Sequence, residues 1–188
     1  MKALKRRVVS DAGELAGVLA QCASELEPGL RLLQRSATAG EIGVELLCVD
    51  DASGRLVLVA SDVVAGPETV LRALEAVAWW REHTALLERM FPGAAVDPRG
   101  APRALIAATR FGDRALRLLR LLGEVAPDAV ECHLFEDAEG LVVAFDRLAV
   151  TPGTRPPAAP AAAPTDEAQR AAALVERLER LRFREVFR

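Results

Sequence analysis

The chain has 188 residues, of which 51% are hydrophobic and 27% charged, so it can bury one good core and carry short appendages. Its formal net charge of -3 gives no overall attraction for nucleic acid or anionic membranes, although a local basic patch is compatible with that value. No apolar stretch is long enough to span a membrane, and the basic start at residues 1–7 is not followed by the apolar segment of a signal peptide. We therefore expect a cytoplasmic protein without a membrane partner.

The cysteines are odd in number and widely spaced, at Cys22, Cys48 and Cys132. No Cys-x-x-Cys pair is present, which argues against both a disulfide framework and a zinc site. The pattern predicts three reduced, buried thiols.

The first half of the chain carries two helix signals and three strand signals. Asp11 and Glu14 have the spacing of a capping box, and apolar residues then recur at helical intervals until Pro28. Strands are predicted at residues 30–35, 43–49 and 55–61, and the polar turn at 50–54 makes the last two a β-hairpin. A long helix is predicted from Pro67 to about Met90.

The second half predicts a strand, a helix and two further strands. Their ranges are 103–109, 113–122, 129–136 and 141–145. A strand, helix and strand in succession imply a crossover connection and therefore some parallel pairing. The chain is thus expected to form an α/β domain with a mixed central sheet flanked by helices.

The composition changes sharply after the last predicted strand. The folded domain is expected to cover residues 1–150, followed by a proline- and alanine-rich linker at 151–165 and an amphipathic helix at 166–188. Leu174, Leu178 and Leu181 form the apolar stripe of that helix. The stripe fits docking on its own domain and capture of a protein partner equally well.

The predicted hairpin resembles the core hairpin of the NucS-type branch of the PD-(D/E)XK nucleases. Residues 43–50 read G-V-E-L-L-C-V-D and residues 54–62 read G-R-L-V-L-V-A-S-D, whereas that branch typically reads G-R-I-D-L-L-x-V-D and then G-R-L-V-V-I-E-L-K. The resemblance continues through the helix after Pro67 and the later strand, helix and strand. It implies a restriction-endonuclease-like fold over roughly residues 11–135.

The resemblance also implies which positions would form the nuclease site. The metal-binding aspartate falls on Glu45, the metal-binding glutamate on Ala60, the lysine on Asp62, and a glutamine of the helix on Arg72. Ala60 offers no side-chain oxygen to Mg²⁺ or Mn²⁺, and Asp62 reverses the charge near a phosphodiester. The resemblance therefore implies a degenerate site with no metal cofactor. A shift of register would give Asp62 a ligand role only if it faced the same side as Glu45.

Other candidate residues have ordinary structural explanations. Asp50 and Asp51 belong to a turn, and His83 is expected on a solvated helix face. Cys132 and His133 are adjacent in a strand and should face opposite sides.

Trp79 and Trp80 are adjacent on a helix, so one is expected in the core and the other at an edge or an interface. The resembled family forms dimers, which implies a homodimer here as well.

Three functions are consistent with these patterns. The leading hypothesis is a catalytically inactive nuclease-like domain that serves as a dimerising, scaffold or protein-interaction module. The alternative is a nucleic-acid-binding domain that does not cut, which would use scattered arginines: Arg72, Arg99, Arg103, Arg110, Arg114 and Arg117. The third is a residual metal-dependent endonuclease that uses Glu45 and Asp62.

Overall fold

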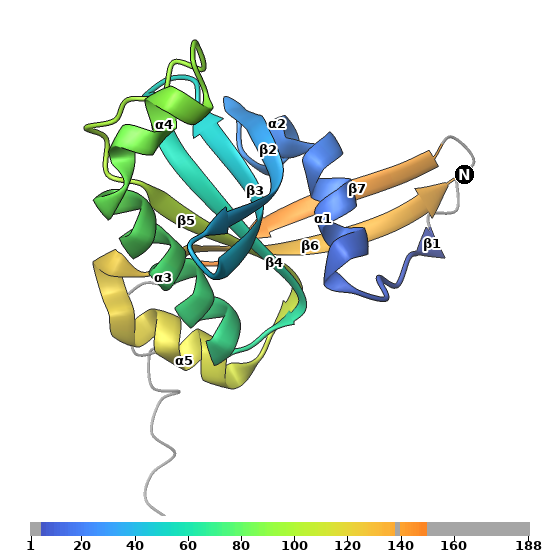
Figure 1. Ribbon diagram of the computed structural model, residues 1–188. Coiled ribbons are helices and arrows are strands. Elements are labelled where there is room, and N and C mark those ends of the chain that lie inside the picture. The colour runs from blue at the N-terminus through green and yellow to red at the C-terminus, as the bar shows by residue number, and fades with distance from the viewer. Residues whose placement is uncertain (1–4, 138–139, 150–188) are drawn as a thin grey trace, which may run out of the picture. The chain divides into compact units, whose positions relative to one another are not determined.

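The computed structural model describes residues 5–137 and 140–149 (Figure 1). The strands are β1 (Lys5–Arg6), β2 (Leu30–Ala39), β3 (Ile42–Asp50), β4 (Arg55–Ala65), β5 (Arg103–Phe111), β6 (Asp128–Asp137) and β7 (Gly140–Arg147). The helices are α1 (Ala12–Gln21), α2 (Ala23–Leu26), α3 (Pro67–Glu82), α4 (Thr84–Met90), α5 (Asp113–Leu122) and the short 3-10 turn η1 (Gly123–Val125). The predicted linker and C-terminal helix, with Leu174, Leu178 and Leu181, lie outside the described residues.

The strands form one mixed sheet in the order β1-β6-β5-β4-β3-β2, and β7 pairs with β6. Strand β3 is antiparallel to both of its neighbours, β2 and β4, whereas β4, β5 and β6 run parallel. Helix α5 makes the crossover between β5 and β6, as the strand, helix and strand pattern predicted. The expectation of a mixed sheet flanked by helices is therefore confirmed.

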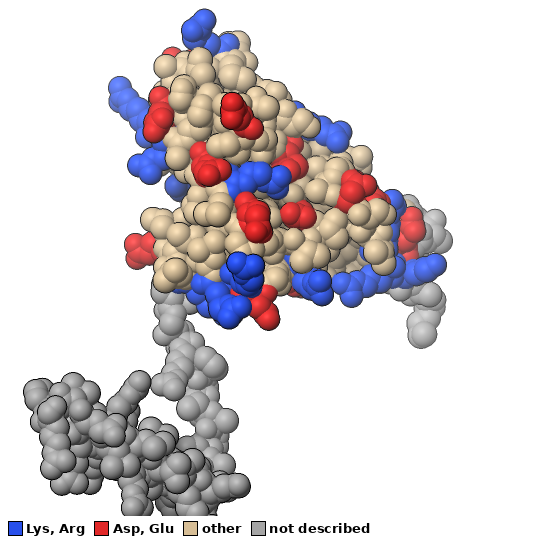
Figure 2. All heavy atoms as spheres, turned by 60° about the horizontal axis from the view of Figure 1, so that its bottom comes forward, with Lys and Arg blue, Asp and Glu red and all other residues tan. Residues whose placement is uncertain are grey.

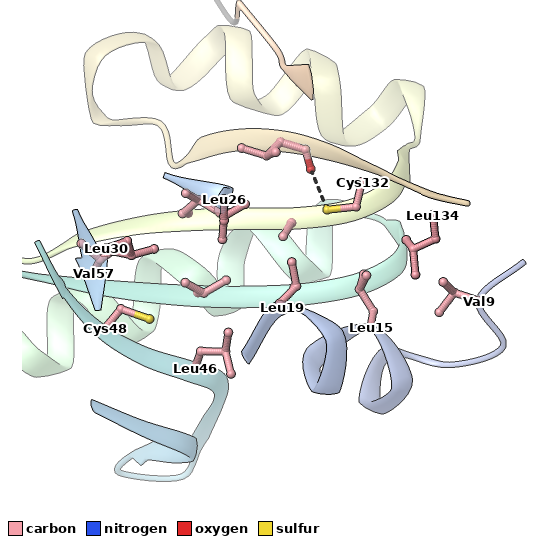
Figure 3. Packing of buried hydrophobic residues seen from close by; sticks show 14 residues of the cluster. Val9, Leu15, Leu19, Leu26, Leu30, Leu46, Cys48, Val57, Cys132 and Leu134 are labelled. Atoms are coloured by element: carbon pink, nitrogen blue, oxygen red, sulfur yellow. Dashed lines mark hydrogen bonds between the residues drawn. The ribbon is translucent and has the colours of Figure 1, made fainter. Parts of the chain in front are cut away.

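Helix α1 covers one face of the sheet. Its fully buried Leu15 and Leu19 belong to the same apolar cluster as Leu46 of β3 and Val57 of β4, and Figure 3 shows both leucines between the helix and the strands. Cys132 of β6 belongs to the same cluster. Because side chains alternate along a strand, the residues next to these face the other way.

Helices α3 and α5 cover the opposite face. Leu56, Leu58 and Ala60 of β4 point to this side, where one cluster is built around the fully buried Trp80 and another is largely alanine. The alanine cluster contains Ala60, Ala65, Ala73, Ala104, Ala108, Ala115 and Ala129. Small side chains on both partners let a helix backbone approach a strand closely.

Several element boundaries differ from those predicted. The first helix is interrupted at Cys22, and the long helix is broken at His83, which ends α3 and precedes α4. Strand β2 extends to Ala39 through a register shift after Leu32, and β4 extends to Ala65. Strand β1 pairs with β6 but is only two residues long, too short for any periodic signal.

The three cysteines are buried and free, which confirms their predicted role as core residues. Burial raises the pKa of the Cys48 and Cys132 thiols to about 12. The pKa of Cys22 is also raised, first by burial and then by the nearby Glu25. These thiols are protonated at neutral pH and are not candidate nucleophiles.

Among the described residues, no helix is both long and apolar enough to cross a bilayer.

Truncating a leucine in the cluster beneath α1 should measure how tightly that core is packed. Leu105 of β5 is fully buried, so Leu105→Ala is expected to lower the free energy of unfolding by about 2–5 kcal/mol in urea denaturation. Leu121 of α5 is 83% exposed, so the control Leu121→Ala should change it by about 0.5 kcal/mol or less. Equal effects of the two variants would contradict this packing.

Candidate functional site

The four positions that the resemblance singled out come together on the α3 face of the sheet. The register of β3 and β4 pairs Leu46 with Val59, which places Glu45 beside Ala60. Asp62 lies two residues further along β4 and therefore faces the same side. Arg72 reaches this place from α3. Glu45 and Asp62 thus face the same side of the sheet, which is the condition that a shared metal-binding role would require.

Both carboxylate oxygens of Glu45 are engaged. Oε1 lies 3.1 Å from the Arg72 guanidinium, and Oε2 accepts a hydrogen bond of 2.8 Å from the Ser61 backbone N–H. The Glu45 side chain is 19% exposed, so its charge is balanced within the protein more than by water. Glu45 is therefore half-buried and fully satisfied.

Arg72 joins the two strands through one guanidinium group. One terminal nitrogen contacts Glu45, and the other donates a hydrogen bond of 3.0 Å to the Ser61 carbonyl oxygen. The Arg72 side chain is 34% exposed, while its Nε is buried and has no hydrogen-bond partner. The cation therefore occupies a position between a carboxylate and a carbonyl oxygen, the two oxygen types that hard metal ions bind.

Asp62 belongs to the start of helix α3. Thr69 Oγ1 donates a hydrogen bond of 2.9 Å to Asp62 Oδ2 and accepts one of 3.3 Å from the Gly66 N–H. Thr69 is buried, and a carboxylate near a helix N-terminus is stabilised by the helix dipole. Asp62 thus has a structural role that needs no metal.

Ala60 is fully buried in the apolar cluster beneath α3. An ionised side chain at this position would lie against the alanines of the helix without water. The position is part of the core rather than an emptied ligand site.

The residues present do not fit a divalent metal ion. Within the described part of the chain, no three His, Cys, Asp or Glu side chains lie close enough to hold one. At the predicted site, Glu45 is bound by Arg72 and Asp62 by Thr69, and Ala60 has no oxygen to give. Arg72 keeps its positive charge at all ordinary pH values, so it repels a second cation there.

The remaining sequence candidates have the structural roles expected of them, with one exception. Asp50 accepts hydrogen bonds from the Ser53 hydroxyl and, to a smaller effect, from the Ala52 N–H within the β3–β4 turn, which lowers the pKa of Asp50. Gly54 in the same turn has a φ of 68°. His133 contacts Asp146 at 3.1 Å on the sheet face opposite the buried Cys132. The exception is His83, which is only partly exposed, because its ring stacks on Trp79.

The two tryptophans divide as expected. Trp80 is fully buried in the core beneath α3. Trp79 is half-buried, stacks on His83 with ring centroids 4.0 Å apart, and lies over Gly40 in the β2–β3 turn. A Cβ atom at Gly40 would lie 2.9 Å from the indole nitrogen, so the turn requires glycine there. Contact of Trp79 with a second copy stays a prediction.

The arginines separate into two groups. Arg72 is committed to Glu45, and Arg103 is committed to Glu27 and Asp128. Four exposed arginines form no ion pair with described residues and gather at the end of β5 and along α5: Arg110, Arg114, Arg117 and Arg120. Arg99 is likewise exposed and without an ion pair to the described residues, but it lies in the loop before β5.

The three arginines on α5 itself are spaced three residues apart, which puts them on one side of the helix. Figure 2 shows Lys and Arg side chains gathered along the lower edge of the domain. The sequence hypothesis omitted Arg120, although this spacing could have identified it.

The chain is structurally similar, over part of its length, to EndoMS-type repair endonucleases. The EndoMS–dsDNA2 complex has a TM-score of 0.37 and 20% identity, and the similarity covers 61% of this chain and 44% of that chain. EndoMS in apo form gives 0.35 and 20%, covering 60% and 43%, and a repair endonuclease from Pyrococcus abyssi gives 0.36 and 17%, covering 57% and 41%. This chain thus spans less than half the length of each. No family model and no curated protein matches it.

Removing Arg72 should leave the Glu45 carboxylate without its cation. We expect Arg72→Ala to lower the free energy of unfolding by about 1–3 kcal/mol, because it leaves the Glu45 carboxylate, 19% exposed, without its cation. Glu45→Gln should cost less, because the Arg72 guanidinium that it leaves is more exposed, at 34%, and keeps its hydrogen bond to the Ser61 carbonyl oxygen. The double variant should cost less than the sum of the two, with a coupling of at least about 0.5 kcal/mol.

Arg81 lies exposed on the same helix without an ion pair to described residues, so Arg81→Ala is the matched control. Denaturant titrations of all four variants measure the cycle. Additive effects would mean that Arg72 and Glu45 do not act on each other.

Proposed function

We propose that this chain is a restriction-endonuclease-like domain that does not cut nucleic acid and serves as an interaction module. The observation that carries the proposal is the Arg72 guanidinium, which bridges Glu45 and the Ser61 carbonyl oxygen at the place where the resemblance implies a metal. A metal-dependent nuclease needs a cation that can bind and polarise a phosphate oxygen at that place. The Arg72 guanidinium, bound to Glu45 and to the Ser61 carbonyl oxygen, supplies a positive charge as a metal ion would. It has no open coordination position for a phosphate oxygen or a water molecule.

Two further features support the proposal. Ala60, at the position implied for the metal-binding glutamate, is packed against α3, so the helix excludes both water and a metal ion from that position. Asp62, at the position implied for a lysine, binds Thr69 and brings negative charge toward any phosphodiester placed there. The leading candidate from the sequence therefore remains ahead of the residual nuclease.

Metal binding and cleavage should both be absent in the wild-type chain. We expect isothermal titration with Mn²⁺ to give no saturable heat at the Glu45 site, and Mn²⁺ or Mg²⁺ to support no cutting of single-stranded, duplex, mismatched or branched DNA. Arg72→Ala should not restore cutting, because Ala60 still supplies no ligand.

Cleavage that requires Mn²⁺ and disappears in Glu45→Gln would contradict the proposal. A folded Glu45→Gln chain, checked by circular dichroism, is needed for that comparison. Cleavage that survives this substitution would indicate a contaminating nuclease, and the metal titration would then decide.

A second candidate function rests on the unpaired arginines of α5. Arg110, Arg114, Arg117 and Arg120 are exposed, and none of them forms an ion pair with a described residue. Asp113 lies beside Arg117 and Arg120 and offsets part of their charge. Phosphate backbones bind such clusters through a charge interaction that releases counterions. Because the formal net charge of the chain is -3, the positive charge of this surface is local and does not extend over the whole molecule.

If this surface binds nucleic acid, the affinity should fall steeply with salt. We expect Arg114→Glu with Arg117→Glu to weaken binding of a labelled duplex about tenfold or more at low salt and to make the slope of log K against log salt shallower by about one for each phosphate that is no longer neutralised. Arg81→Glu with Arg99→Glu changes the net charge equally away from α5 and should have little effect. A folded wild-type chain that shows no binding at low salt would remove this candidate.

A further inference from the structure

Strand β7 is an edge strand with little protection against pairing. Within the described part of the chain it pairs with β6 along one side and with no strand along the other. Residues 141–145 read L-V-V-A-F, without charge or proline, and Leu141 and Val142 are 37% and 44% exposed. Natural proteins usually place lysine, proline or a bulge on such an edge to prevent strand addition.

Residues 141–145 are apolar on both faces, and the His133–Asp146 pair lies beside Ala144 on the face opposite α1. The register pairs Leu134 with Val143 and Cys132 with Phe145, so the odd-numbered residues of β7 face the cluster beneath α1. Val142 and Ala144 therefore point to the opposite face, where both are exposed. An added strand that covers residues 141–145 would find apolar side chains of β7 on both faces of the sheet.

The edge is held in place at its C-terminal end. Arg147 forms an ion pair with Glu27 and lies 3.7 Å from Asp128. The Leu148 N–H then donates a hydrogen bond of 2.8 Å to the Ala129 carbonyl oxygen. A strand that is fixed in this way is a ready template for pairing.

A groove of about 410 Å³ runs beside the edge, between α1 and β7. Its helical side is formed by Val18, Gln21, Cys22 and the carboxylate Glu25, and its strand side by residues 141–143. An apolar side chain on a strand added to β7 would lie next to this groove and could pack against Val18 and Val143.

We propose that β7 pairs with β7 of a second copy of this chain, antiparallel, about a two-fold axis at Val143. Because the axis is perpendicular to the sheet, the α1 faces of the two copies lie on the same side of the joined sheet. Leu141 then lies opposite Phe145 of the second copy, and Val142 lies opposite its Ala144. Every cross-strand pair from 141 to 145 is then apolar, and no like charges meet.

The segment that follows β7 in the same chain is a poorer occupant of the edge. Residues 151–164 contain five prolines, which lack the N–H group that strand pairing needs: Pro152, Pro156, Pro157, Pro160 and Pro164. A second β7 has the required backbone groups and the matching apolar pattern. This pairing rests on the proposed function, because it names a partner for the interaction module. The two are tested separately: the domain can lack metal binding and cleavage, as proposed, and still not dimerise through β7.

The test is the oligomeric state of the full 188-residue chain, measured by sedimentation equilibrium over a range of concentrations. We expect the wild type to dimerise and Val142→Lys to raise the dissociation constant about tenfold or more, because lysine on an edge opposes pairing. Val142 is exposed, so the variant should keep its fold, which its melting temperature checks. Leu121→Lys adds the same charge at an exposed position of α5 and should leave the dimer unchanged.

Mixing two variants identifies the register. Position 142 of one copy lies opposite position 144 of the other, so V142K and A144E should each dimerise weakly alone and form a heterodimer when mixed. Recovery of the dimer in the mixture supports the pairing. A wild type that is monomeric at its highest soluble concentration, a dimer indifferent to V142K, or a mixture that does not recover overturns it.

Discussion

Strand β4 lies at the centre of the sheet and has helices packed on both of its faces. Residues 56–60 are fully buried, with alternate side chains beneath α1 and beneath α3. Helix α3 can approach because Ala60, Ala73 and Ala76 are small. A carboxylate at position 60 would need water or a cation where the helix now packs, so close packing of α3 and a metal site on β4 exclude each other. The apolar run of the strand ends at Ser61, which is still fully buried, and at Asp62, which is partly exposed.

The Arg72 contacts form at that boundary. Ser61 gives its N–H to Glu45 and its carbonyl oxygen to Arg72, so a single residue joins a β3 carboxylate to an α3 cation. Each of the two charged groups loses part of its hydration in the folded protein, and its partner replaces the lost interactions. A half-buried ion pair is stable only when this compensation is present. The carboxylate of β3 and the carbonyl oxygen of β4 are thus bound by a cation that is a side chain of the protein itself.

Much of the architecture could be predicted because it rests on local patterns. The alternation in residues 43–50 and 54–62, the turn at Gly54 and the crossover from β5 to β6 are all visible in the sequence. The breaks at Cys22 and His83 were missed, because the apolar period continues across both positions while the helix direction changes. Strand β1 was missed because two residues carry no pattern.

The candidate site was only partly predictable. The resemblance brought Glu45, Ala60, Asp62 and Arg72 to notice as separate departures from the nuclease pattern, but nothing local in the sequence indicates that residues 45 and 72 bind each other. Likewise, the Asp62 contact with Thr69 depends on where α3 begins relative to β4. Long-range pairs of this kind follow from the tertiary fold, and a sequence shows them only when the fold is already known.

The sheet order has a consequence for how the surfaces of this domain could be used together. Strand β7 lies beyond β6, at the far side of the sheet from β3, so pairing through it leaves the Arg72 region and the exposed side of α5 uncovered. An axis perpendicular to the sheet would place both copies of α5 on the same face of one continuous sheet. Two arginine clusters, each too small to bind tightly at physiological salt, would then act as a bivalent surface, and the gain would come from effective concentration rather than from new contacts. Loss of the edge pairing would therefore weaken nucleic-acid binding as well, although no arginine of α5 had been changed.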